Sequence, residues 1–254
     1  MKSMKIAIVT GASSGMGREM VYQLADRFGG YSEIWVIARR DERLNEFVGN
    51  VPVKIRKFAI DLTESSNLEV LKQALETRKP DVKMLVNAAG FGRTGTVGSI
   101  PADSSCGMVR LNNEALVAVT EMVLPYMSAG SRIIQFASAA AFVPQPGFAV
   151  YAATKSFVLS YSRALAAELK DKKIYVTAVC PGTVDTEFLP DALYGKELPF
   201  YKKMVLSNPK AVVSHAIADS LKGKEISVYG PVMKGFTLLC KLVPHNLIMK
   251  FITW

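Results

Sequence analysis

Tyr151 and Lys155 form the pattern with the clearest chemical meaning, a phenol and an amine four residues apart in a segment predicted to be helical. Residues at this spacing lie on one face of a helix, one turn apart. A neighbouring ammonium favours phenolate over phenol, so we expect Lys155 to lower the pKa of Tyr151 from its usual value of about 10. Such a tyrosine can exchange a proton with a carbonyl or an alcohol. The same spacing also arises by chance on surface helices, so the elements around the pair decide its meaning.

A glycine-rich loop near the N-terminus supplies one of these elements. The β-branched run 6–10 predicts a buried parallel strand, residues 11–17 have the spacing G-x-x-x-G-x-G, and a helical pattern follows to about residue 28. Glycines at a strand–helix junction permit a tight turn and let backbone N–H groups approach a ligand. The helix N-terminus behind them attracts phosphate, so the loop predicts a dinucleotide site.

The end of the next strand, residues 33–38, indicates which dinucleotide is bound. A chain that uses NAD places a carboxylate here for the ribose 2′-hydroxyl, whereas this chain has Ala38 followed by Arg39 and Arg40. An arginine can donate two hydrogen bonds to a 2′-phosphate. The sequence therefore favours NADP over NAD. Arg39 is the stronger candidate, and Arg40 is interpreted as an ordinary loop charge.

Polar side chains follow the later strands. Asp61 ends the third strand and could contact adenine or cap the next helix. A long helix over 103–127 carries two amides. Asn113 is assigned to a solvated face, while a buried Asn112 could hold a water or bend the helix. Ser138 follows the fifth strand, at the sheet edge where open α/β sheets build their sites, thirteen residues before Tyr151.

Composition limits the remaining classes. A chain of 254 residues with 50% hydrophobic residues fits one α/β domain. The net charge of +9 is scattered, and no nucleic-acid-binding motif is present. Three separated cysteines and two histidines predict neither disulfides nor a metal site. Because no signal-peptide pattern precedes the first strand, we expect a cytoplasmic protein.

The ordered set of motifs resembles the short-chain dehydrogenase/reductase family in its single-domain branch, over about residues 4–230. The matching residues are Thr10-Gly11-x-x-x-Gly15-x-Gly17, Asn87-Ala88-Ala89-Gly90, Asn112, Ser138, Tyr151-x-x-x-Lys155 and Pro181-Gly182. The resemblance implies an α/β fold, a doubly wound Rossmann-type parallel sheet of about seven strands in a three-layer α/β/α arrangement.

The resemblance also implies residue roles. The catalytic residues would be Asn112, Ser138, Tyr151 and Lys155. The cofactor would be held by Gly11, Ser13, Ser14, Gly15, Met16, Gly17, Arg39, Asp61, Leu62, Asn87, Ala88, Ala89, Gly90, Tyr151, Lys155, Pro181, Gly182, Val184 and Thr186. The substrate would contact Phe91, Ser138, Phe142, Phe148 and Phe188. One departure concerns Ser14, because relatives that use NADP often carry a basic residue there.

Two segments of the single domain (residues 1–254) carry less information. Residues 187–208 correspond to a substrate lid, whose aromatic residues line an apolar pocket or simply pack. The apolar tail, about 231–254, is interrupted by Pro244 and is too broken to span a membrane. It could cover the pocket or an oligomer interface, and contact with a membrane surface is the weaker alternative.

The sequence therefore predicts an NADP-dependent oxidoreductase that reduces a carbonyl, or oxidises the alcohol, of a small-to-medium apolar substrate. The alternatives are a non-catalytic NADP-binding regulatory or scaffold protein and a membrane-associated lipid (3-oxoacyl) reductase. The resemblance further implies a homodimer or homotetramer paired through helices 103–127 and 150–170. No nucleic-acid partner is expected.

Overall fold

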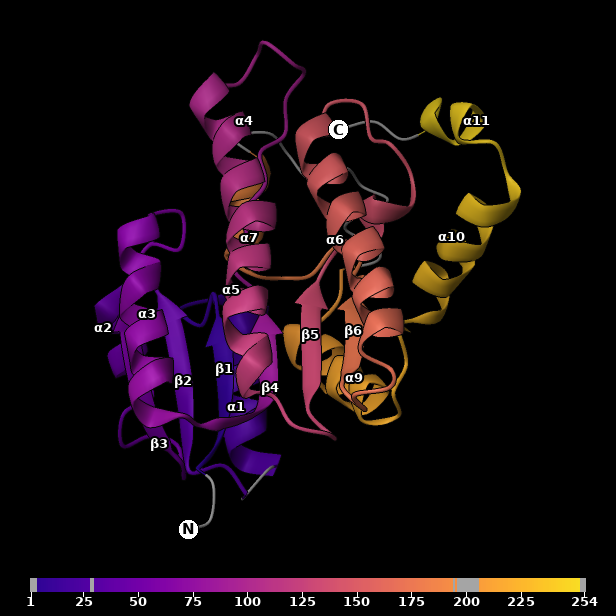
Figure 1. Cartoon of the computed structure of the whole chain (residues 1–254). Helices are drawn as coiled ribbons and strands as arrows, with labels where there is room; N and C mark the ends of the chain where they lie inside the picture. Colours follow the sequence, from indigo (N-terminus) through magenta and orange to yellow (C-terminus); the bar gives the residue numbers. More distant parts are fainter. Residues whose placement is uncertain (1–3, 28–29, 194, 196–205, 252–254) are drawn as a thin grey trace.

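Seven parallel strands form one central sheet within the part of the chain that the computed structural model describes, residues 4–27, 30–193, 195 and 206–251 (Figure 1). Their order is β3-β2-β1-β4-β5-β6-β7. The strands are β1 (Lys5–Thr10), β2 (Glu33–Ala38), β3 (Lys54–Ala59), β4 (Asp81–Asn87), β5 (Arg132–Phe136), β6 (Tyr175–Val179) and β7 (Ile226–Ser227). The chain adds β2 and β3 on one side of β1 and then crosses to add β4 on the other side. The switch point therefore lies between β1 and β4, as in doubly wound nucleotide-binding folds. The fold class and the strand number predicted from the sequence are confirmed.

Helices cover both faces of the sheet (Figure 1). One face carries α1 and α9, and the other carries α3, α5 and α6. The helices are α1 (Gly15–Arg27), α2 (Asp41–Asn45), α3 (Ser65–Arg78), α4 (Ala102–Val109), α5 (Ala115–Val123), α6 (Ala149–Glu168), α7 (Phe188–Leu193), α9 (Pro209–Leu221), α10 (Pro231–Leu242) and α11 (His245–Met249). Short 3-10 turns are η2 (Leu124–Tyr126) and η3 (Ala139–Phe142).

Side chains along β1 point alternately to the two faces of the sheet and so contribute to two separate parts of the core. Ala7 and Val9 point to the face covered by α1 and α9, while Ile6 and Ile8 point to the face covered by α3, α5 and α6. All four side chains are fully buried. A strand buried on both faces is expected to read as a continuous apolar run, which explains why β1 was recognisable in the sequence.

The predicted helix over 103–127 is continuous but not uniformly α-helical. A π turn, η1 (Arg110–Glu114), joins α4 to α5 and carries both asparagines. The extra residue of a π turn lets Asn112 and Asn113 both face α6. Asn113 is buried, and its Nδ2 donates to the carbonyl oxygen of Thr154 at 2.9 Å. The assignment of Asn113 to a solvated face was therefore wrong.

Thr10, the last residue of β1, forms hydrogen bonds across the switch point between β1 and β4. Its hydroxyl donates to the carbonyl oxygen of Val86 at 3.4 Å and accepts from the backbone N–H groups of Ala88 and Ala89 at 3.1 and 3.2 Å. These bonds join the end of β1 to the chain leaving β4. They fix the carboxyl edge of the sheet, where a ligand site is expected.

A buried carboxylate stabilises the opposite edge. Glu33 accepts hydrogen bonds from Arg56 and Trp35, both at 3.0 Å, and pairs with Lys54 at 3.1 Å and Arg78 at 3.4 Å. Burial raises the pKa of the Glu33 carboxyl, but the bonds from Arg56, Trp35 and Lys54 outweigh it and lower the pKa to about 2. Because the folded-state pKa is lowered from 4.5, the stabilisation is complete above pH 4.5 and is lost as the pH falls toward 2.

We expect Glu33→Gln to lower the free energy of unfolding at pH 7 by about 3 kcal/mol, because it removes a buried carboxylate whose pKa is lowered from 4.5 to about 2 by its cationic partners. Urea titrations from pH 7 to pH 2 should show the gap to the parent protein closing below pH 4.5, as the parent's carboxylate is protonated. Glu69→Gln, in an exposed pair with Lys72, is the matched control and should change stability by less than about 0.5 kcal/mol. A gap that is independent of pH would contradict this account.

Candidate active site and cofactor cleft

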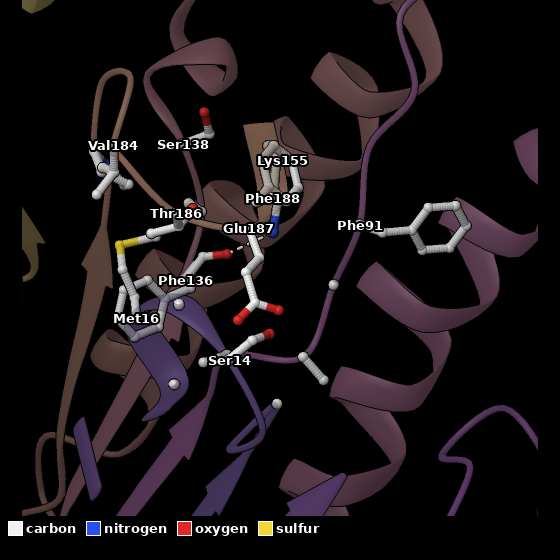
Figure 2. Close-up of a pocket in the computed structure, with 18 of the residues that line it drawn as sticks. Ser14, Met16, Phe91, Phe136, Ser138, Lys155, Val184, Thr186, Glu187 and Phe188 are labelled. Atoms are coloured by element: carbon white, nitrogen blue, oxygen red, sulfur yellow. Dashed lines mark hydrogen bonds between the residues drawn. The ribbon is translucent and has the colours of Figure 1, made fainter. Parts of the chain in front are cut away.

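A cavity of about 710 Å³ lies at the carboxyl ends of β1, β4, β5 and β6. Most residues predicted to bind the cofactor line it: Gly11, Ser13, Ser14, Gly15, Met16, Gly17, Arg39, Asp61, Leu62, Ala88, Ala89, Gly90, Tyr151, Lys155, Pro181, Gly182, Val184 and Thr186. Figure 2 shows side chains from distant segments, among them Met16, Lys155 and Thr186, converging on this space.

The glycine loop leaves room that a side chain would fill. Gly11 has φ of +66°, and a Cβ there would lie 2.7 Å from the backbone of Ala88. A Cβ on Gly17 would overlap with the carbonyl oxygen of Gly11. Helix α1 begins at Gly15, so its free N–H groups face the cavity side of the loop. The loop thus fits the pyrophosphate of a dinucleotide.

Two arginines line the cavity where β2 ends. Arg39 Nη1 lies 3.8 Å from a carboxylate oxygen of Asp61, and its side chain is 73% exposed. Arg40 donates from Nη2 to the hydroxyl of Ser13 at 3.1 Å and pairs with Glu187 at 3.4 Å. Arg40 was interpreted as a loop charge, yet it lines the cavity and contacts the glycine loop. Its position directly after Arg39 was the only signal in the sequence.

Asp61 does not cap helix α3, and its carboxylate is hydrogen-bonded to Thr63. Its Oδ1 accepts from the backbone N–H and the hydroxyl of Thr63, at 2.9 and 2.7 Å. Burial raises the pKa of Asp61, while the two bonds from Thr63 and the charge of Arg39 produce a net lowering. Helix α3 begins only after Glu64, so the capping alternative is excluded. A carboxylate held in this way beside the cavity can accept a hydrogen bond from a ligand.

Tyr151 and Ser138 form the chemical centre of the cavity. Burial raises the pKa of the Tyr151 phenol to about 12, and the neighbouring Ser138 side chain acts in the opposite direction. The backbone N–H of Ala140 donates to the Ser138 hydroxyl oxygen at 3.1 Å, which orients the hydroxyl hydrogen away from η3. At neutral pH the phenol is therefore protonated, with a second hydroxyl beside it.

Lys155 is buried beneath the pair. Its Nζ donates to the carbonyl oxygen of Phe136 at 2.7 Å, the dashed contact in Figure 2, and lies 5.7 Å from the centroid of the Tyr151 ring. Burial lowers the pKa of Lys155 to about 8. The expected lowering of the Tyr151 pKa by Lys155 is wrong for this arrangement, because the ammonium is directed to a backbone carbonyl and burial dominates at the phenol.

Asn112 lies next to Lys155 but not on the cavity wall. Its amide donates to the carbonyl oxygen of Phe91 at 2.9 Å and to the Thr154 hydroxyl at 3.0 Å, and its Oδ1 accepts from the N–H of Phe91 at 3.0 Å. A Cβ on Gly90 would lie 2.9 Å from Oδ1 of Asn112 and 3.5 Å from Nζ of Lys155. Asn112 therefore fixes the chain after β4 and thereby the space above Lys155.

Two other predicted site residues lie outside the cavity lining. Asn87 is buried below it, and its Nδ2 donates to Thr120 and Gln135, both at 3.0 Å. As the last residue of β4, Asn87 joins the sheet to α5 rather than facing a ribose. Phe142 packs instead against the tail, in a cluster that contains Cys240. Its place at the end of η3 turns it away from Tyr151.

The end of the cavity around Tyr151 is apolar. The ring of Phe148 stacks on Tyr151 with centroids 4.3 Å apart, and Phe188 lies 5.6 Å from Tyr151. Phe91 also lines the cavity, although Figure 2 shows its ring directed away from Lys155. Of the predicted lid, residues 187–193, 195 and 206–208 are described, and residues 194 and 196–205 lie outside the described residues.

Helix α10 completes this apolar wall with residues that were not individually predicted to line the pocket. Val232, Met233 and Phe236 line the cavity. A Cβ on Gly182 would lie 2.7 Å from the sulfur of Met233, so the tail is packed directly on the turn after β6. Of the alternatives left open for the tail, covering the pocket agrees with the position of these three residues. The helical spacing of Val232, Met233 and Phe236 was the available signal.

Among the described residues, no three His, Cys, Asp or Glu side chains come close enough to hold a metal ion. The same part of the chain contains no helix that is both long and apolar enough to cross a bilayer.

Comparison with known proteins adds the family context. The family model of short chain dehydrogenases matches residues 5–194. Sulfoacetaldehyde reductase 2 of Chromohalobacter salexigens is 33% identical over 189 residues, covering 72% of this chain and 74% of that protein.

Solved structures agree in fold. A short-chain dehydrogenase from Sphingobium yanoikuyae in complex with NADPH superposes with a TM-score of 0.78 at 25% identity, covering 98% of this chain and 96% of that one. A 3-ketoacyl-(acyl-carrier-protein) reductase from Brucella melitensis complexed with NADH has a TM-score of 0.75 at 24% identity, covering 89% and 96%. Both nicotinamide cofactors thus occur on this fold.

We expect Gly90→Ala to destabilise the protein by about 1–3 kcal/mol and to weaken nucleotide binding, because the new methyl group overlaps with Asn112 and crowds Lys155. Thermal unfolding and fluorescence titration with NADPH measure the two effects. Gly30→Ala is the matched control, since nothing lies within 4 Å of its Cβ position. Equal behaviour of the two variants would show that the space at Gly90 is not constrained.

Proposed function

This chain belongs to the short-chain dehydrogenase family, and on that premise we propose that it is an NADP-dependent oxidoreductase that reduces a carbonyl on a small-to-medium apolar substrate. One observation carries the proposal. Tyr151 and Ser138 both line the apolar end of the same cavity whose other end is formed by the glycine loop and two arginines, and the Ser138 side chain acts to lower the pKa of the Tyr151 phenol. A proton donor and a nucleotide site thus share one space.

The proposed roles of the residues follow from this arrangement. The glycine loop and the N-terminus of α1 would bind the pyrophosphate, and Lys155 would donate to the nicotinamide ribose. Bound NADPH supplies a hydride to the carbonyl carbon. Tyr151 would give its phenolic proton to the carbonyl oxygen, so that an alcohol forms. Ser138 would donate a hydrogen bond to that oxygen as negative charge develops on it.

The raised pKa of Tyr151 supports the direction of reduction. A phenol with a pKa of about 12 is fully protonated at neutral pH and is ready to donate. The phenolate left behind is disfavoured by burial, and the Ser138 side chain acts in the opposite direction and stabilises it. Lys155 keeps its charge below its pKa of about 8, so we propose that reduction is supported on the acid side of that value.

The preference for NADP is proposed from the arginines. Arg39 and Arg40 line the adenosine end, and the described carboxylates near them are already paired, Asp61 with Arg39 and Glu187 with Arg40. A 2′-phosphate would find two guanidinium groups there. The similar structures hold NADPH in one case and NADH in the other, so the proposal rests on the two arginines.

We also propose that the protein is a homo-oligomer, in which subunits pair through the segment α4–α5 and through α6, as expected from the family resemblance. Val109 of α4 and Phe157 of α6 are exposed apolar side chains on these helices, and Phe157 stacks with Tyr161 at 6.0 Å. A molecular mass in solution equal to one chain would contradict this proposal.

Tyr151→Phe should leave NADPH affinity within about twofold and lower turnover by about 10²–10⁴-fold, because it removes the proton donor while keeping the ring. NADPH oxidation against a panel of apolar ketones and aldehydes measures turnover, and fluorescence titration measures affinity. A parent protein that binds NADPH but consumes none with any carbonyl would instead favour a non-catalytic binding protein.

Arg39→Ala and Arg40→Ala should each raise the KM for NADPH by about 10–100-fold, the loss of a charge-assisted hydrogen bond, with little change for NADH. Arg43→Ala is the matched control, because Arg43 pairs with Glu46 and Glu187 but does not line the cavity. Steady-state kinetics with both cofactors distinguish the outcomes. Parent enzyme that uses NADH better than NADPH would overturn the role of both arginines.

A further inference from the structure

Helix α10 has two unlike faces. Met233, Phe236 and Cys240, spaced three and four residues apart, face inward, where they line the cavity or pack with Val143. On the outer side, Leu238, Leu239 and Leu242 are exposed, the last with 73% of its surface accessible. The inward face has a defined partner within the chain, so the helix is anchored independently of its outer face.

The outer apolar surface continues onto the following residues. Leu247 of α11 is exposed, and Phe251 is 78% exposed. Figure 1 shows α10 and α11 at the margin of the molecule, beyond α6. Exposed large apolar side chains grouped on one short segment are unusual on a soluble surface and indicate a binding surface. We call residues 231–251 the tail surface.

The charge of the tail surface is of one sign. Residues 231–254 contain Lys234, Lys241 and Lys250 and no aspartate or glutamate. No described residue forms an ion pair with these lysines. Lys234 and Lys241 are two turns apart on α10, in the same row as Leu238, so their charges border the exposed leucines.

These features favour one occupant. A second copy paired symmetrically would place the same lysines near one another without acidic partners. An anionic lipid surface offers both complements at once, acyl chains for the leucines and phosphate groups for the ammonium groups, whose aliphatic stems can extend along the apolar face. We propose that the tail surface binds an anionic lipid bilayer, with α10 lying in the plane of the interface.

Docking in this way would bring the cavity to the lipid. Val232 lines the cavity and is also exposed on the same helix, so the apolar end of the cavity would open beside the bilayer. The binding itself depends only on the tail surface and holds whether or not the proposed reaction is right.

The test is flotation of the full-length protein with vesicles of phosphatidylcholine alone and with about one third phosphatidylglycerol. We expect binding only to the anionic vesicles, weakening as salt is raised, since surface charges are screened. A triple change Leu238→Ser, Leu239→Ser, Leu242→Ser should weaken vesicle binding at least about tenfold. Its matched control changes three exposed valines on other surfaces, Val48→Ser, Val70→Ser and Val97→Ser, and should bind normally.

A second pair of variants tests charge without altering apolar area. Lys234→Glu, Lys241→Glu and Lys250→Glu should abolish binding, whereas Lys170→Glu, Lys172→Glu and Lys222→Glu, which cause the same change in net charge, should weaken it less than about threefold. Thermal unfolding of every variant establishes that it is folded. Failure of the parent protein to float with anionic vesicles, or equal losses in both lysine variants, would overturn the proposal. Light scattering that shows the leucine variant becoming monomeric while flotation is unchanged would assign the surface to a second copy and would also overturn it.

Discussion

Lys155 keeps its amine almost fully buried by donating a hydrogen bond to the carbonyl oxygen of Phe136, 2.7 Å away. A buried cation is expensive unless polar groups surround it, and the pKa of about 8 reflects that cost. Much of the site is arranged around this one side chain. Phe136 ends β5, Gly90 leaves space above the amine, and the π turn positions Asn112 beside it. The strand, the glycine and the irregular helix turn therefore depend on one another.

A second constraint, the close approach of backbone segments, acts at the carboxyl edge of the sheet. Gly11 and Gly17 must lack side chains because the backbone of Ala88 and the Gly11 carbonyl occupy the space a Cβ would need. Thr10 then draws the chain after β4 against the end of β1 through three hydrogen bonds. This close approach creates the crevice into which the free N–H groups of α1 are directed. At the opposite edge, the carboxylate of Glu33 joins β2, β3 and α3, so the two ends of the sheet are fixed by different chemistry.

The fold could be predicted from the sequence because its signals are local. Runs buried on both faces identify β1 and β2, and the loop 11–17 can be recognised without knowledge of distant contacts. Ser138, Tyr151 and Lys155 were also predicted correctly as cavity residues, since strand ends and helical spacing place them.

Asn87 and Phe142 were misplaced because side-chain direction at the end of a strand or a 3-10 turn depends on tertiary neighbours, here Thr120 and Cys240. The pKa of Tyr151 was predicted wrongly for a similar reason. The helical spacing places an ammonium near the phenol, but it does not reveal that the phenol is buried or that the ammonium is hydrogen-bonded to the carbonyl oxygen of Phe136. Arg40 was missed because only its contact with Ser13, distant in the sequence, distinguishes it from a loop charge.

The contact between Gly182 and Met233 has a consequence for anyone who wishes to alter the cavity. Because position 182 has no side chain, the sulfur of Met233 can lie only 2.7 Å from the point where a Cβ would be. Positions 182 and 233 are therefore coupled, because any side chain at position 182 would displace the Met233 side chain. A chimaera that receives another protein's tail must match it to this turn, so the tail and the segment after β6 are best exchanged together as one cassette.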